Sequence, residues 1–163
     1  MEIPTWQIII PDPVQDLVRF VPVDSQNWRE CTKLPTGEDH RFVAPNVYSI
    51  AEAQFWPGAK SMCIYHEAQM VGYTLYNLFY GDAKELGLWI TRLMIAEPWR
   101  HRGYARAAVQ QILGEARQER CVEAALSTEP ENFKAIRLYE SLGFRATGRI
   151  EKGEMVYSCH LSA

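Results

Sequence analysis

The chain has 163 residues, of which 47% are hydrophobic and 23% are charged, and its formal net charge is −3. This length fits one domain that buries its core without disulfide or metal staples, and the composition is that of an ordinary globular protein. No apolar stretch reaches the length of a membrane span. The acidic balance argues against a nucleic-acid binder, which needs clustered Lys and Arg. We therefore expect a soluble, cytoplasmic domain without membrane or nucleic-acid partners.

The beginning of the chain differs from the rest. Residues 1–16 have no basic stretch followed by a cleavable apolar core, and Pro11-Asp12-Pro13 indicates a turn or an extended arm. We expect an N-terminal arm over 1–16 and a single domain over 17–163. The cysteines and histidines show neither C-x-x-C nor metal-ligand spacing, which predicts free thiols and no metal site.

The first third of the domain predicts one strand and two short helices. A β-rich run over 17–23 is followed by a helix over 26–33, which Asp24 or Ser25 can cap. A Pro- and Gly-containing loop over 34–41 leads to a second helix, which we expect Ser49 to cap and which ends before Pro57.

The remaining pattern predicts alternating strands and helices. Two apolar runs, separated by Glu67-Ala68-Gln69, form an antiparallel hairpin that Gly81-Asp82 closes. A third strand leads into an amphipathic helix, and Gly143 ends a second long helix. The expected elements are strands at 61–66, 70–79, 86–95 and 121–126, helices with inner faces Ala108, Val109, Ile112, Leu113, Ala116 and Ala135, Leu138, Tyr139, Leu142, and two final strands from Phe144, split near Gly153. The order predicts a three-layer α/β fold with helices on both sides of a mixed sheet.

One segment of this pattern is suited to phosphate binding. The run Arg100-His101-Arg102-Gly103-Tyr104-Ala105 lies between the strand end Leu93-Met94-Ile95 and the amphipathic helix. The first turn of a helix has unpaired amides and the positive end of the helix dipole, and Gly103 and Ala105 leave room for an anion. The segment therefore predicts a bound phosphate group.

The spacing Arg-x-x-Gly-x-Ala in this segment resembles the pyrophosphate-binding motif of the GCN5-related N-acetyltransferases (GNAT), as does the element order over 17–159. The C-terminal stretches 129–132 and 138–144 are similar across that family. Three further stretches, 27–31, 42–53 and 92–95, resemble bacterial spermine/spermidine (diamine) acetyltransferases. The resemblance implies a mostly antiparallel sheet and a cytoplasmic enzyme that uses acetyl-CoA without a metal.

The resemblance also implies site residues. The strand at Leu93, Met94 and Ile95 would separate from its neighbour and offer backbone amides to the cofactor and to the carbonyl oxygen. Tyr139 would donate a proton to the sulfur of coenzyme A, although an inward tyrosine can also be a core residue. Asn132 would contact the cofactor or cap its helix. The expected cofactor-binding residues are Leu93, Met94, Ile95, Arg100, His101, Arg102, Gly103, Tyr104, Ala105, Arg106, Asn132 and Tyr139.

The acceptor is expected to be a primary amine, with spermine and spermidine as the first candidates. Glu30 and Glu52 are the carboxylates that we place against a cationic chain, and Tyr48 and Trp56 can flank it by cation–π contact. Glutamates on a surface helix are also commonly solvated, and aromatic residues at helical spacing commonly pack. The general base is open, because relatives of this type carry an acidic residue where this chain has Ala96.

Four alternatives keep the same cofactor. The acceptor can be an amino acid, an aminoglycoside or a protein amino group, or the chain can be a non-catalytic acetyl-CoA sensor. Tyr139 argues against the sensor. A homodimer through the final strands follows from family analogy alone.

Overall fold

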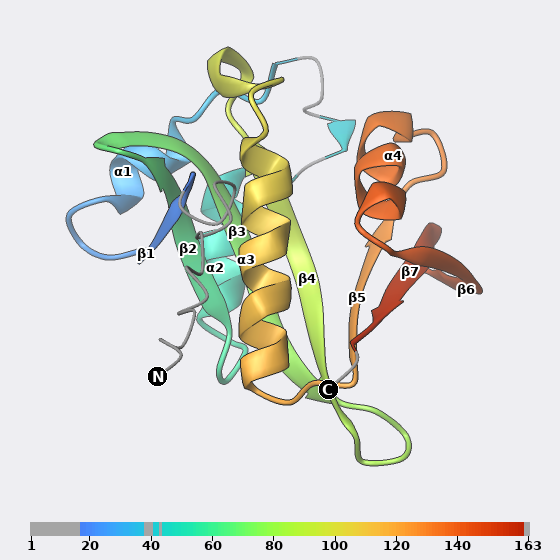
Figure 1. Ribbon diagram of the computed structural model, residues 1–163. Helices are drawn as coiled ribbons and strands as arrows, with labels where there is room; N and C mark the ends of the chain where they lie inside the picture. The colour runs from blue at the N-terminus through green and yellow to red at the C-terminus, as the bar shows by residue number, and fades with distance from the viewer. Residues whose placement is uncertain (1–16, 38–40, 43, 162–163) are drawn as a thin grey trace, which may run out of the picture.

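Seven strands form one sheet in the order β1-β2-β3-β4-β5-β7-β6 (Figure 1). The computed structural model describes residues 17–37, 41–42 and 44–161, so the expected arm over 1–16 lies outside the described residues. The strands are β1 Arg19–Pro22, β2 Lys60–His66, β3 Gln69–Tyr80, β4 Leu86–Ile95, β5 Glu123–Thr128, β6 Arg145–Glu151 and β7 Glu154–His160. The helices are α1 Trp28–Thr32, α2 Asn46–Ala53, the 3₁₀ turn η2 Glu97–Trp99, α3 Tyr104–Gln118 and α4 Phe133–Ser141.

The pairing of β4 decides where a site can form. All neighbouring strands are antiparallel except β4 and β5, which are parallel and pair only from Gly87–Glu123 to Ile90–Leu126. Strand β4 continues to Ile95, so its last residues have no ladder partner on the β5 side. Thr91 is an extra residue in the register with β3, and such a bulge bends and twists a strand. The sheet therefore opens between β4 and β5, as the resemblance implies.

Helices cover both faces of the sheet, which confirms the predicted three-layer arrangement. On one face, α3 and α4 pack on a core that includes Ile112, Ala124, Leu126 and Tyr139. On the other face, α1 and α2 bury Cys31 and Ala53 against β2, β3 and β4. Because side chains alternate along a strand, Ala125 and Ser127 face the α1/α2 side of β5.

Two turn signals were assigned wrongly from sequence. Ser49 does not cap α2: it is fully buried inside a helix that begins at Asn46, with Pro45 at the N-cap position. The Asn46 side chain donates to the carbonyl of Cys31 at 2.9 Å, so contact with α1 fixes this start. The β2–β3 hairpin turns at Glu67-Ala68, within the predicted connection, but Gly81-Asp82 does not close that hairpin. The Gly81 amide instead donates to the carbonyl of Glu85 in the turn before β4.

The other predicted boundaries of helices and strands agree with the structure within a few residues. Strand β5 covers 123–128 where 121–126 was expected, because the Cys121 amide donates to the carbonyl of Ala116 at the end of α3. Gly143 follows α4 with a φ of +96°, a left-handed conformation that favours glycine, as predicted.

The described residues can be compared with the expectations for cysteines, metal ligands and membrane spans. All four cysteines are buried and none forms a disulfide. Within the described ranges, no group of His, Cys, Asp and Glu is arranged to hold a metal ion. No helix in that part of the chain has both the length and the apolar character needed to cross a membrane.

Candidate active site

The start of α3 presents backbone amides that have no acceptor within the helix. Gly103 is the N-cap residue with a φ of +85°, and the first bond inside the helix runs from the Ala107 amide to the Gly103 carbonyl at 3.0 Å. The amides of Tyr104, Ala105 and Arg106 precede that bond and therefore have no acceptor within the helix. Unpaired amides and the helix dipole together attract negative charge.

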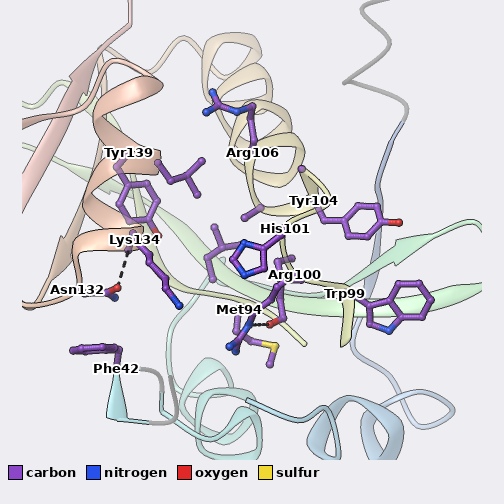
Figure 2. A pocket seen from close by; sticks show the side chains of 16 residues that line it. Phe42, Met94, Trp99, Arg100, His101, Tyr104, Arg106, Asn132, Lys134 and Tyr139 are labelled. Atoms are coloured by element: carbon purple, nitrogen blue, oxygen red, sulfur yellow. Dashed lines mark hydrogen bonds between the residues drawn. The ribbon is translucent and has the colours of Figure 1, made fainter. Parts of the chain in front are cut away.

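These residues border a cavity of about 320 Å³ between the end of β4, the start of α3 and the inner face of α4 (Figure 2). The basic side chains of Arg100, His101, Arg106 and Lys134 lie around it, whereas no Asp or Glu does among the described lining residues. The rest of the lining is largely apolar. Such a cavity fits an anionic group with an apolar extension.

The structure brings most of the predicted cofactor residues together in this cavity. These are Leu93, Met94, Ile95, Arg100, His101, Gly103, Tyr104, Ala105, Arg106, Asn132 and Tyr139. Arg102 is the exception, because its guanidinium lies over the ring of Trp99 at 5.2 Å, outside the cavity. Sequence reasoning missed Phe42, Trp99, Lys134, Ala135 and Leu138 as lining residues. The helical spacing of Lys134 to Leu138 was a usable signal for α4, but nothing local pointed to Phe42.

The side chain of Arg100 contacts the loop after α1. Its Nε donates to the carbonyl of Ile95 at 3.0 Å, and its Nη2 donates to the carbonyl of Thr36 at 2.5 Å. The Glu97 amide donates to the carbonyl of Pro35 at 2.9 Å, which adds a second tie to the same loop. The segment that begins α3 is thus bonded directly to the loop that carries Phe42.

Tyr139 lies where the cavity meets the opening of the sheet. Its side chain is 9% exposed, and its ring contacts Phe144 edge-on with the centroids 5.8 Å apart. Burial raises the pKa of Tyr139 to about 12, so the phenol keeps its proton at neutral pH. Its hydroxyl has no hydrogen-bond partner in the described part of the chain, and Figure 2 shows it turned toward Lys134 and Asn132. It is therefore a protonated group that is free to donate.

Asn132 caps α4, as one of the two predictions for it stated. Its side-chain oxygen accepts from the Ala135 amide at 3.4 Å. The same residue lines the cavity, so the cap leaves it within reach of a ligand.

A second, polar cavity of about 90 Å³ lies in the opening between β4 and β5. Tyr139 lines it from α4, and Thr91, Ser127 and Glu154 line it from three strands. The hydroxyl of Ser127 donates to Oε2 of Glu154 at 2.5 Å. Alternation along β5 and β7 places Ser127 and Glu154 on the α1/α2 face, so Tyr139 and Glu154 reach the opening from opposite faces. The arrangement can give a proton on one side of the sheet and take one on the other.

The family model described as the acetyltransferase (GNAT) family matches residues 26–144. The chain belongs to this family. It is 30% identical over 102 residues to a spermine/spermidine N(1)-acetyltransferase of Bacillus subtilis, a match that covers 60% of this chain and 67% of that protein. It is an acetyl-CoA-dependent N-acetyltransferase.

Solved structures show the same fold. Arabidopsis thaliana Naa50 in complex with the bisubstrate analogue CoA-Ac-MVNAL has a TM-score of 0.63 and 21% identity, covering 87% of this chain and 97% of that one. A GNAT family acetyltransferase from Elizabethkingia anophelis with acetyl-CoA bound has a TM-score of 0.63 and 15% identity, covering 90% and 99%.

The predicted acceptor residues of this acetyltransferase are not gathered in one place. Glu52 lies 3.8 Å from the guanidinium of Arg92, so its carboxylate already faces a cation. Glu30 and Tyr48 are exposed and line neither cavity, whereas Trp56 lines a separate groove. Their role in acceptor binding stays a prediction.

The structure shows the surroundings of Ala96, which stands after β4 where relatives carry an acidic residue. Ala96 is buried and its amide donates to the carbonyl of Val71 at 2.8 Å, while Glu97 is exposed outside both cavities. Glu154, which sequence reasoning missed, is a carboxylate that does line the polar cavity. It lies on the β6–β7 hairpin, far from Ala96 in the sequence, and no local pattern marks it.

Proposed function

We propose that this acetyltransferase transfers the acetyl group of acetyl-CoA to a primary amine of a polyamine or diamine, with spermine and spermidine as the first candidates. The observation that carries the proposal is the polar cavity through the sheet, which has Tyr139 on the α3/α4 side and Glu154 on the α1/α2 side. The curated relative in Bacillus subtilis supports the choice of acceptor.

The larger cavity fits the cofactor. The amides of Tyr104, Ala105 and Arg106, with the basic side chains of Arg106 and Lys134, would hold its diphosphate. The unpaired edge of β4 at Leu93 to Ile95 would accept its pantetheine arm by backbone hydrogen bonds. The bound cofactor supplies an acetyl thioester, and the chain's own residues do the rest.

Proton transfer is the main chemical task for these residues. An alkylamine has a pKa of about 10, so it arrives mostly protonated at neutral pH and must lose one proton to become a nucleophile. Glu154, held by Ser127, would accept that proton directly or through one water. Tyr139 would donate a proton to the departing sulfur as the carbon–nitrogen bond forms and the carbon–sulfur bond breaks. Backbone amides on the free edge of β4 would stabilise the carbonyl oxygen.

An acceptor screen with thiol detection tests the proposal. Purified protein with acetyl-CoA should release free thiol with spermidine and spermine faster than with an amino acid, an aminoglycoside or a peptide with a free N-terminus. Mass spectrometry of the product identifies the acetylated nitrogen. Turnover of one of the other amines without turnover of any polyamine would contradict the acceptor, and cofactor binding without turnover of any amine would indicate a sensor.

A peptide amino group is the second candidate acceptor. The similar structure of Naa50 carries an acetylated peptide analogue joined to coenzyme A, and an open groove leads away from the polar cavity in this chain. The predicted homodimer would use the final strands, of which β6 is exposed along its whole length.

A further inference from the structure

A groove of about 900 Å³ lies on the α1/α2 face of the sheet, separate from the cofactor cavity. It runs over β3, β4, β5 and β7 between the end of α2 and strand β6. Trp56, Phe79 and Trp89 are among the aromatic side chains in its walls. Its size exceeds that of the cofactor cavity, and the proposed chemistry does not use it.

A glycine shapes the floor of this groove. Gly87 on β4 pairs with Phe79 on one side and with Glu123 on the other. A Cβ atom at Gly87 would clash with the ring of Phe79, so only glycine lets that ring lie across β4 toward Glu123. Trp89 meets the ring of Phe79 edge-on with the centroids 6.5 Å apart. Aromatic rings and a carboxylate therefore line the same groove, which is the combination that binds alkylammonium groups.

The charge of the groove is unbalanced. Asp82, Glu123 and Glu151 line it with Arg149, and the guanidinium of Arg149 is 3.0 Å from the carboxylate of Glu151. Glu123 is half-buried and forms no ion pair with any other described residue. A negative, aromatic groove of this kind favours an organic cation over an anionic or apolar ligand.

The groove continues from the reaction centre. Ser127 lines the polar cavity, whereas Ala125 and Glu123, two and four residues earlier on the same face of β5, line the groove. Four strand residues span about 13 Å at about 3.3 Å per residue. On β7, Glu154 borders the cavity and Val156 and Ser158 border the groove in the same way.

We propose that this groove binds the distal ammonium groups of a linear polyamine, with Glu123 as the ionic partner and the rings of Phe79 and Trp89 along the chain, while the near amine reacts at Glu154. This inference rests on the proposed function and adds a requirement to it. The acceptor needs a second cation at a distance from the nitrogen that is acetylated, so monoamines and short diamines bind less tightly than spermidine and spermine.

Steady-state kinetics with a series of amines test the inference. We measure kcat/KM for propylamine, putrescine, spermidine and spermine with the wild type, with Glu123→Gln and with Glu119→Gln, which changes an exposed carboxylate at the end of α3. The isosteric Glu123→Gln should raise the KM for spermine about five- to tenfold and leave that for propylamine within about twofold. Glu119→Gln should change neither.

A binding titration separates this inference from the proposed function. Spermine is titrated by calorimetry into wild type and Glu123→Gln saturated with coenzyme A, which has no acetyl group to transfer. Weaker binding to the variant supports the groove even if no amine is acetylated, an outcome in which the proposed function alone fails. Equal spermine affinity of the two proteins would overturn the inference. So would equal kcat/KM values for propylamine and spermine in the wild type, or equal effects of Glu123→Gln on the two amines.

Discussion

The cavity that we assign to the cofactor and the groove that we assign to the acceptor are built in opposite ways. The cavity takes most of its lining from one continuous stretch, 93–106, and from the adjacent face of α4, and it relies on backbone amides. The groove takes its lining from the segment after α2, the β3–β4 turn, β6 and the face of four other strands, and it relies on side chains. We therefore expect cofactor binding to be more sensitive to backbone changes at the start of α3, and acceptor binding to be more sensitive to single side-chain changes.

The largest loss of activity should come from a substitution of Tyr139, which lies between the two regions. Tyr139→Phe removes the hydroxyl and keeps the ring against Phe144, so kcat should fall about 10²-fold or more while the Kd for acetyl-CoA stays within about twofold. The pKa of about 12 sets the direction of the pH dependence: the acid is present below that pH and is lost as the pH rises through it. Stopped-flow kinetics and calorimetry measure the two quantities, and an unchanged kcat would make Tyr139 a core residue.

A similar loss is expected on the acceptor side of the opening. Glu154→Gln should lower kcat/KM for the amine about 10²-fold at pH 7, because Glu154 is the sole carboxylate among the described residues that line the cavity. Activity should recover as the pH rises toward about 10, where a growing fraction of the amine arrives already deprotonated. Glu67→Gln, in the turn after β2, is the matched control. A loss that persists at high pH would indicate that Glu154 serves the fold instead.

These two residues show what the sequence could and could not predict. Tyr139 and the turn at Gly103 were predicted to share one site, and the structure places both in one cavity, because local patterns mark them: a helical inner face, and a glycine between a strand and a helix. Glu154 and Phe42 were not found, because their positions depend on the pairing of β7 with β5 and on the ties of the 34–42 loop to Arg100. Ser49 was misassigned since contact of Asn46 with α1 sets the helix start.

A backbone change should damage the cofactor side more than the acceptor side. Gly103→Ala places a side chain at a φ of +85°, which costs about 1–3 kcal/mol of unfolding free energy and disturbs the first-turn amides. The Kd for acetyl-CoA should rise about tenfold. Gly114→Ala, in the same helix with open space around it, should instead stabilise the fold by about 0.5–1 kcal/mol and leave the Kd unchanged. Urea titration and calorimetry measure both, and equal behaviour of the two variants would contradict the role of Gly103.

The smallest expected effect distinguishes two roles of Arg100. Arg100→Ala removes the bonds to Ile95 and Thr36, so the loop that carries Phe42 should loosen and the KM for the amine should rise about threefold. The Kd for acetyl-CoA should stay within about twofold. A tenfold weaker Kd with an unchanged amine KM would show that the guanidinium binds phosphate.

A crystal structure of the protein with coenzyme A and spermine tests the central claim most directly. We predict that the diphosphate accepts hydrogen bonds from the amides of Tyr104, Ala105 and Arg106, and that one end of the polyamine lies against Glu154 on the opposite face of the sheet. Both ligands on the same face, or a diphosphate held away from the start of α3, would contradict it.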